Sequence, residues 1–149
     1  MKTVKAEFKL IHEDAKVPSK KRPEDAGYDV TSIEEGEIPS GKFWKPGHKV
    51  FRTGIRIAVP SGYFISVRGR SGLGFQGVQP FIGTLDATYN GELLILLMNH
   101  SNKPYTVNKG DRIAQIVIEE QIAIEPVEVE EFSPEYDKRG RAGFGSSGK

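Results

Sequence analysis

The sequence predicts an all-β fold. Many short segments have the alternation of a strand, turn signals separate them, and no long segment has a clean helical period. The chain is also rich in turn formers, with 17 glycines and 9 prolines. Together these observations favour an antiparallel sandwich, jelly roll or barrel. A length of 149 residues fits one domain.

The N-terminal segment has the clearest strand periodicity. Apolar residues at positions 4, 6, 8 and 10 alternate with polar ones, and period two predicts a strand with one buried face. Residues 16–25 are charged, contain two prolines and are typical of a loop. A short strand is expected over 28–33. Residues 36–47, with three glycines and two prolines, predict a turn-rich connection.

The middle of the chain predicts a hairpin. Residues 50–59 alternate through Ile55, Ile57 and Val59, and a Pro-Ser-Gly turn follows at 60–62. The next strand is expected over 63–67. Two such runs on either side of a short turn are typical of strands that pair with each other.

The second half of the chain predicts four more strands. Residues 93–98 form an unbroken apolar run, which favours a strand buried on both faces. Shorter strands are expected over 105–107 and 112–119, and residues 122–132 alternate again. Residues 137–149 are rich in glycine and serine, so we expect a tail that cannot order itself.

Composition excludes several classes of protein. Lys plus Arg total 21 and Asp plus Glu total 20, a net charge of +1 that argues against a nucleic-acid binder. No apolar run is long enough to cross a membrane, and the alternating N-terminus is not typical of a signal peptide. The chain has no cysteine for a disulfide or a thiolate zinc site. These features predict a cytoplasmic protein.

The histidines and the single tryptophan carry no predicted role. His12, His48 and His100 are widely spaced and form no metal-binding motif, so a metal held by the protein is not expected. Trp44 lies in a stretch rich in glycine and proline, and we interpret it as a packing residue.

The sequence Arg70-Ser71-Gly72-Leu73 predicts an anion site. A strand is expected to end near position 67, and a helical turn can begin at Ser71, since serine is a favoured N-cap. Backbone N–H groups at a helix start attract anions, and the guanidinium of Arg70 suits phosphate oxygens. A surface arginine beside a capped turn remains the alternative.

Two further polar positions stand out. Asp86 lies in the segment 83–92 that leads into the apolar run, where it can act as a base or orient a water molecule. A turn aspartate bonded to local backbone donors is the alternative. Gln115 is the odd polar residue in the strand expected over 112–119, and it needs hydrogen-bond partners on the protein or on a ligand.

The C-terminal tail contains a superficial phosphate-loop pattern. Residues 143–149 read GFGSSGK, but a P-loop must follow a strand and open a helix, so we reject that assignment. Glycine N–H groups, serines and arginines can still contact phosphates, and Phe144 can stack on a base. A terminus without a role is the alternative.

Taken in order, these segments resemble the five motifs of the trimeric dUTPase family. The matching segments are 26–32, 70–73, 83–91, 110–115 and 139–148. The resemblance implies a jelly-roll-like distorted β-barrel that assembles as a homotrimer, with three active sites built from residues of all three subunits. It also implies a barrel domain over 1–136 and a flexible glycine-rich arm over 137–149 that closes over the site.

The resemblance implies hydrolysis of dUTP to dUMP and pyrophosphate. Asp86 would be the base for a water that attacks the α-phosphorus, and Tyr89 would pack under the deoxyribose. Mg²⁺ would be bound through the triphosphate without a direct protein ligand, with Asp29 near its water shell. The implied substrate-binding residues are Arg70, Ser71, Gly72, Gly83, Thr84, Leu85, Tyr89, Gln115, Arg139, Phe144, Gly145, Ser146 and Ser147.

One segment departs from the family pattern, and two other functions remain open. Residues 74–82 are slightly shorter than is common and contain Gln79-Pro80-Phe81 where base recognition is expected, and proline has no N–H to donate. A dCTP deaminase or a bifunctional deaminase–dUTPase shares the fold, but no carboxylate or histidine lies between Ser71 and Leu85 to catalyse deamination. A nucleotide-gated regulatory binding protein is the other alternative.

Overall fold

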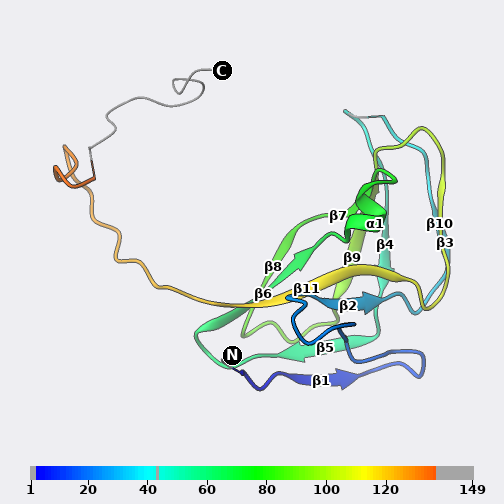
Figure 1. The fold of residues 1–149 in the computed structure, drawn as a ribbon, viewed down its shortest axis with the longest axis horizontal. Coiled ribbons are helices and arrows are strands. Elements are labelled where there is room, and N and C mark those ends of the chain that lie inside the picture. The colour runs from blue at the N-terminus through cyan, green and yellow to red at the C-terminus, as the bar shows by residue number, and fades with distance from the viewer. Residues whose placement is uncertain (1–2, 43, 137–149) are drawn as a thin grey trace.

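The computed structural model describes residues 3–42 and 44–136 and is built almost entirely of β-strands (Figure 1). The described part contains one helix, of four residues. In chain order the elements are β1 (Glu7–Leu10), β2 (Tyr28–Thr31), β3 (Gly36–Ile38), β4 (Gly47–Arg52), β5 (Ile55–Ala58), β6 (Tyr63–Arg68), α1 (Ser71–Gly74), β7 (Val78–Pro80), β8 (Gly83–Asp86), β9 (Leu94–Asn99), β10 (Tyr105–Val107) and β11 (Arg112–Glu120).

The described strands form four antiparallel sheets. The largest has the order β2-β11-β6-β8, and the next has the order β4-β9-β7, while β1 pairs with β5 and β3 with β10. The longest strand, β11, therefore lies between β2 and β6. Inward-facing apolar residues of these sheets make one core, whose largest fully buried side chains include Phe51, Ile38, Ile55, Ile65, Leu93, Ile95, Leu97, Ile113 and Ile116. The predicted all-β fold is confirmed.

The predicted hairpin between β5 and β6 is wrong. Although the two strands are neighbours in sequence, β5 pairs with β1, and β6 pairs with β11 and β8. The turn between them, closed by a hydrogen bond from the N–H of Tyr63 to the carbonyl oxygen of Pro60, passes the chain from one sheet to another. Alternation fixes which face of a strand is buried, but it does not choose the partner strand.

Strand β9 is not buried on both faces within one chain. Ile95, Leu97 and Asn99 are buried, whereas Leu94 is 50% exposed and Leu96 is half-buried. The facing strand β4 adds Val50, which is 48% exposed and lies opposite Leu96. The sheet therefore has an outer face of apolar side chains that the described residues leave uncovered.

The strand expected over 122–132 is also absent. The last strand ends at Glu120, and every residue from 121 to 136 is exposed. Figure 1 shows this segment running away from the barrel in extended form. Its alternating apolar residues pair with no strand in the described part of the chain, and alternation without a partner does not make a strand.

Two smaller expectations need correction. The connection predicted over 36–47 contains the short strand β3, which pairs with β10. Trp44 is 79% exposed, so it is not a packing residue within this chain. No helix among the described residues has the length and hydropathy to cross a bilayer.

Candidate active site

A cavity of about 390 Å³ lies at the start of α1. Its wall brings together segments that are far apart in sequence: the loop before β2, the start of α1 and the middle of β11. The lining residues are Lys20, Lys21, Asp25, Ala26, Gly27, Asp29, Arg70, Ser71, Gly72, Arg112 and Gln115. Four cationic side chains against two carboxylates give the wall of this cavity a net positive charge.

Asp29 holds two arginines in this cavity. One of its carboxylate oxygens accepts a hydrogen bond from Nε of Arg70 at 2.7 Å, and the other accepts from Nη1 of Arg112 at 3.1 Å. Nη1 of Arg70 also donates to the backbone carbonyl of Arg112 at 3.1 Å. The Asp29 side chain is only 19% exposed and that of Arg70 is 25% exposed. The guanidinium of Arg70 is therefore held in one orientation by the protein.

The helix after Arg70 begins as expected, but its cap differs. Arg70 itself is the N-cap, in extended conformation, and no side chain caps the helix, so the prediction of Ser71 as N-cap is wrong by one position. The carbonyl of Arg70 accepts from the N–H groups of Leu73 and Gly74, which close the first turn. A side chain built at Gly72 would meet open space, so packing in this chain does not require that glycine.

Gln115 finds its hydrogen-bond partner on the protein. Its Nε2 donates to the backbone carbonyl of Gly69 at 2.6 Å, next to Arg70. A Cβ at position 27 would lie 1.9 Å from its Oε1, so a side chain at Gly27 would displace the Gln115 amide. The polar residue in β11 thereby joins the segment 26–32 to the approach to α1.

Asp86 lies elsewhere, at the end of β8. It faces Phe64 of β6 in the strand register, is exposed and is followed by a turn in which the N–H of Tyr89 donates to the backbone carbonyl of Asp86 at 2.9 Å. It lines a second cavity, of about 520 Å³, together with Thr84 and residues of the turn before β6. No carboxylate hydrogen bond joins Asp86 to the described part of the chain.

The structure brings together some of the predicted site residues and separates others. Arg70, Ser71, Gly72, Gln115 and Asp29 share one cavity, and Thr84 and Asp86 share the other. The two cavities have no lining residue in common.

The remaining predicted residues lie outside both cavities. Gly83 begins β8 and Leu85 packs against the core. Tyr89 is 45% exposed. The predicted contacts Arg139, Phe144, Gly145, Ser146 and Ser147 lie outside the described residues.

The atypical segment 74–82 and the cationic wall add two observations. Pro80 is buried in β7 opposite Leu97, while Phe81 is 61% exposed. Lys20, Lys21 and Arg112 line the first cavity but were not predicted as site residues. The charged loop 16–25 was the available signal for the two lysines, although charge alone does not tell a cavity wall from a solvated loop.

The described residues contain no group of three His, Cys, Asp or Glu side chains that could hold a metal ion. The two carboxylates of the first cavity have different hydrogen-bond partners. Asp29 is engaged with Arg70 and Arg112, and Asp25 accepts from the backbone N–H of Arg22 at 3.0 Å.

Known proteins match the chain over nearly its whole length. The sequence model of the dUTPase family matches residues 13–148. The deoxyuridine 5'-triphosphate nucleotidohydrolase of Nautilia profundicola is 40% identical over 150 residues, covering 98% of this chain and 100% of the relative. The protein of the same description from Kluyveromyces lactis is 41% identical, with 91% of this chain and 88% of the relative covered.

Solved structures share the fold. A mutant dUTPase of Staphylococcus bacteriophage 80alpha, solved with dUpNHpp, superposes with a TM-score of 0.86 at 28% identity and covers 99% of this chain and 100% of its own. A mutant dUTPase of phage phi11 of S. aureus, described as coordinating a structural Mg(II) ion, has a TM-score of 0.76 at 26% identity and covers 86% and 98%.

Proposed function

The chain belongs to the dUTPase family, and we propose that it is a dUTP diphosphatase that hydrolyses dUTP to dUMP and pyrophosphate. The observation that carries the assignment within the structure is the cationic cavity at the start of α1, where Asp29 fixes Arg70. A triphosphate needs cationic and N–H donors in a fixed arrangement, and this cavity supplies them.

Arg70, Ser71, Gly72 and Gln115 would bind the phosphates. The bonds from Arg70 to Asp29 and to the carbonyl of Arg112 leave the Nη2 group for a phosphate oxygen, since it donates to no described residue. The open space at Gly72 lets a ligand approach the backbone closely. Gln115 would turn its amide group from the Gly69 carbonyl toward the substrate, or bind while keeping that bond.

Asp86 would act as the base. Its carboxylate takes a proton from a water molecule whose oxygen attacks the α-phosphorus, while the bond to the bridging oxygen breaks and pyrophosphate leaves. The position at the end of a paired strand holds the backbone of Asp86 in place, and its exposed carboxylate can reach a water molecule. Tyr89 would pack under the deoxyribose, with Gly83, Thr84 and Leu85 forming the adjoining strand.

Mg²⁺ would enter with the triphosphate. Bound there, the ion neutralises charge on the phosphate oxygens. The donor set supports this arrangement because both carboxylate oxygens of Asp29 accept hydrogen bonds from arginines. Asp29 would thus contact the water shell of the ion and not the ion itself.

A homotrimer would complete the site. Within one chain Asp86 and the Arg70 cavity are separate, so a shared site requires these parts from different subunits. Two uncovered apolar surfaces also support assembly: the outer face of β4 and β9, and the extended segment 121–136, where Ile122 is 85% exposed. Sedimentation should give about three times 16.5 kDa, and a monomer at micromolar concentration would contradict shared sites.

The arm 137–149 would close over the bound nucleotide. Arg139, Gly145, Ser146 and Ser147 would contact the β- and γ-phosphates, and Phe144 would stack on uracil. Removing residues 133–149 should lower kcat/KM by about 10²-fold or more, since closure excludes water and adds donors. The melting temperature should change little because residues 133–136 are exposed and contribute little to the core. A large drop in melting temperature would show that the arm stabilises the fold.

Pyrophosphate release from dUTP, dCTP, dTTP and UTP is the direct test. Hydrolysis of dUTP well above the other three is expected. Formation of deoxyuridine nucleotides from dCTP would instead support a deaminase. No release from any of the four, with tight dUTP binding, would support a regulatory binding protein.

A further inference from the structure

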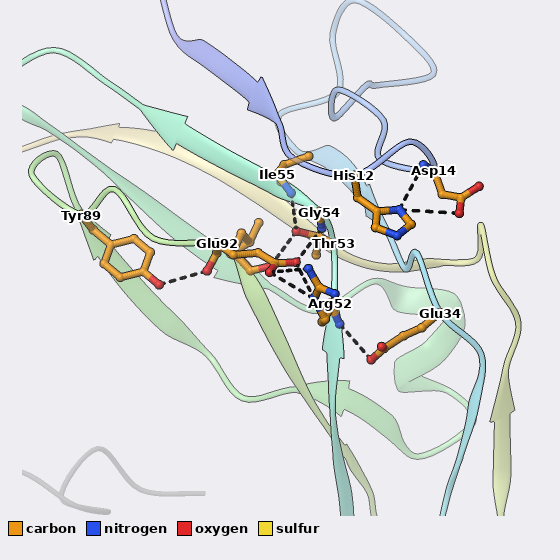
Figure 2. Close-up of polar contacts among 10 residues, drawn as sticks. His12, Asp14, Glu34, Arg52, Thr53, Gly54, Ile55, Tyr89 and Glu92 are labelled. Carbon is orange, nitrogen blue, oxygen red and sulfur yellow. Dashed lines mark hydrogen bonds and ion pairs between the residues drawn. The ribbon is translucent and has the colours of Figure 1, made fainter.

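The loop between β8 and β9 is fastened to the corner between β4 and β5 through Glu92 (Figure 2). Its carboxylate accepts from Nε of Arg52 at 3.2 Å, from Nη2 of Arg52 at 3.1 Å and from the backbone N–H of Gly54 at 2.9 Å. The Glu92 side chain is only 17% exposed. One carboxylate therefore holds two segments that lie almost forty residues apart in sequence.

The corner that receives Glu92 is itself fixed. Gly54 has a φ of +67°, a conformation that favours glycine, and a Cβ there would lie 2.9 Å from the side chains of His12 and Ala15. The backbone N–H of Arg52 donates to the carboxylate of Glu34 at 3.1 Å. Glu92 thus binds donors whose positions are set by the surrounding fold.

The start of β9 has separate anchors. Oγ1 of Thr53 donates to the carbonyl of Leu93 at 2.6 Å, and the N–H of Leu93 donates to the carbonyl of Ile55 at 2.9 Å. Both Thr53 and Leu93 are buried. The N–H of Leu93 and the carbonyl of Glu92 belong to one peptide group, so the Glu92 carboxylate is a second anchor on the residue at which the loop ends.

Tyr89 is held at the other end of this loop. Its hydroxyl donates to the backbone carbonyl of Glu92 at 3.0 Å. Its ring lies over Gly91, where a Cβ would come within 2.5 Å of the hydroxyl oxygen. Figure 2 shows the Tyr89 side chain pointing toward Glu92, with its hydroxyl at the Glu92 carbonyl. The place of the Tyr89 ring therefore depends on where the backbone of Glu92 is held.

We propose that Glu92 is a positioning residue for sugar discrimination, acting through its bonds to Arg52 and Gly54 on the placement of Tyr89. The inference rests on the proposed function, in which Tyr89 packs under the deoxyribose. A loop fixed at Glu92 prevents the Tyr89 ring from moving away from the 2′-hydroxyl of UTP. UTP is therefore rejected by a steric clash with the ring. A loosened loop would accept UTP more readily.

Glu92→Gln tests the proposal with little change in shape. The amide loses the charge and one acceptor oxygen, so the bonds to Arg52 and Gly54 weaken. The ratio of kcat/KM for dUTP to that for UTP should fall about tenfold, while kcat for dUTP falls less. Amide hydrogen exchange over residues 86–92 should accelerate. Arg52→Met should lower the same ratio, and the double variant should lower it by less than the product of the two single effects.

The control removes a glutamate from an ion pair elsewhere. Glu7→Gln, at the start of β1, removes the ion pair with Lys5 and should leave the ratio of kcat/KM for dUTP to that for UTP unchanged. An unchanged ratio in Glu92→Gln with normal exchange over 86–92 would overturn the proposal, and so would an equal loss of activity toward both substrates. Failure of the unmodified chain to hydrolyse dUTP would reject the proposed function instead, and the exchange measurement would still report whether Glu92 fixes the loop.

Discussion

The Arg70 cavity and the end of β8 differ in how completely one chain builds them. In the cavity the functional side chains are bonded to the protein: Arg70 to Asp29, and Gln115 to the carbonyl of Gly69. At the end of β8 the backbone is fixed by strand pairing, yet the carboxylate of Asp86 is exposed and bonds to no described residue.

The difference separates two tasks. A group that binds phosphate gains from being oriented before the ligand arrives, because less ordering remains to be done on binding. A base must exchange protons with water, so its carboxylate needs an open side. In the proposed function, the phosphate-binding half is thus organised within one chain, and the catalytic half would be completed by the substrate and another subunit.

Asp86→Asn should have the largest effect on activity, and a small effect would contradict the difference between the two regions. Losing the base should lower kcat by about 10³-fold. Binding of dUTP, measured by calorimetry, should stay within a few-fold because the phosphate contacts lie in the other cavity. Hydrolysis within tenfold of the unmodified chain would reject Asp86 as the base.

Arg70→Met should impair the other region, the Arg70 cavity. The variant loses a phosphate donor and leaves Asp29 bonded to Arg112 alone, so kcat/KM should fall by about 10²-fold with a clear rise in KM. Arg70→Lys is the matched variant, since it keeps the charge but cannot bond to Asp29 and phosphate together. Full activity in Arg70→Lys would show that charge alone matters at this position.

Gly27→Ala tests the Arg70 cavity by displacing the side chain of Gln115 without removing it. The added Cβ would overlap Oε1 of Gln115, which must then leave the Gly69 carbonyl. We expect kcat/KM to fall by about tenfold. Ala58→Gly, at an exposed position of β5 outside both cavities, is the control and should retain activity. Unchanged kinetics in Gly27→Ala would mean that the position of Gln115 does not matter for binding.

Glu119→Gln should have the smallest effect of these variants, and it should change neither the Arg70 cavity nor the end of β8. Hydrogen bonds from Ser66 and Arg68 lower the pKa of Glu119 from its ordinary value, so the ionised form stabilises the folded state. That contribution is present above the unfolded pKa and is lost as the pH falls through the folded pKa. The variant should melt about 1 to 2 °C lower at pH 7 and at the same temperature as the unmodified chain near pH 2. A difference that persists in acid would contradict this origin.

The sequence was sufficient for the fold class and for several strands, but it did not predict β3, β7 or β8 and did not identify the partner of each strand. Alternation located β1, β5 and β11, and the ordered segments identified Arg70 and Asp86 with the family. Pairing of β5 with β6 was wrong because the turn at 60–62 leads into another sheet. The salt bridges of Asp29 and the Glu92 contacts had no signal in the sequence, since they join positions 38 to 83 residues apart.

What the sequence determined by itself is local: which segments are extended, which face of each is apolar, and which chemical groups are available. These follow from period, turn residues and side-chain type, all of which act over a few positions along the chain. Tertiary structure decided the rest: that Asp29 orients Arg70, that Glu92 fixes the loop of Tyr89, and that Asp86 stands apart from the phosphate cavity. The physical reason is that a hydrogen bond depends on distance in space, and the distance is set only when the sheets pack around one core.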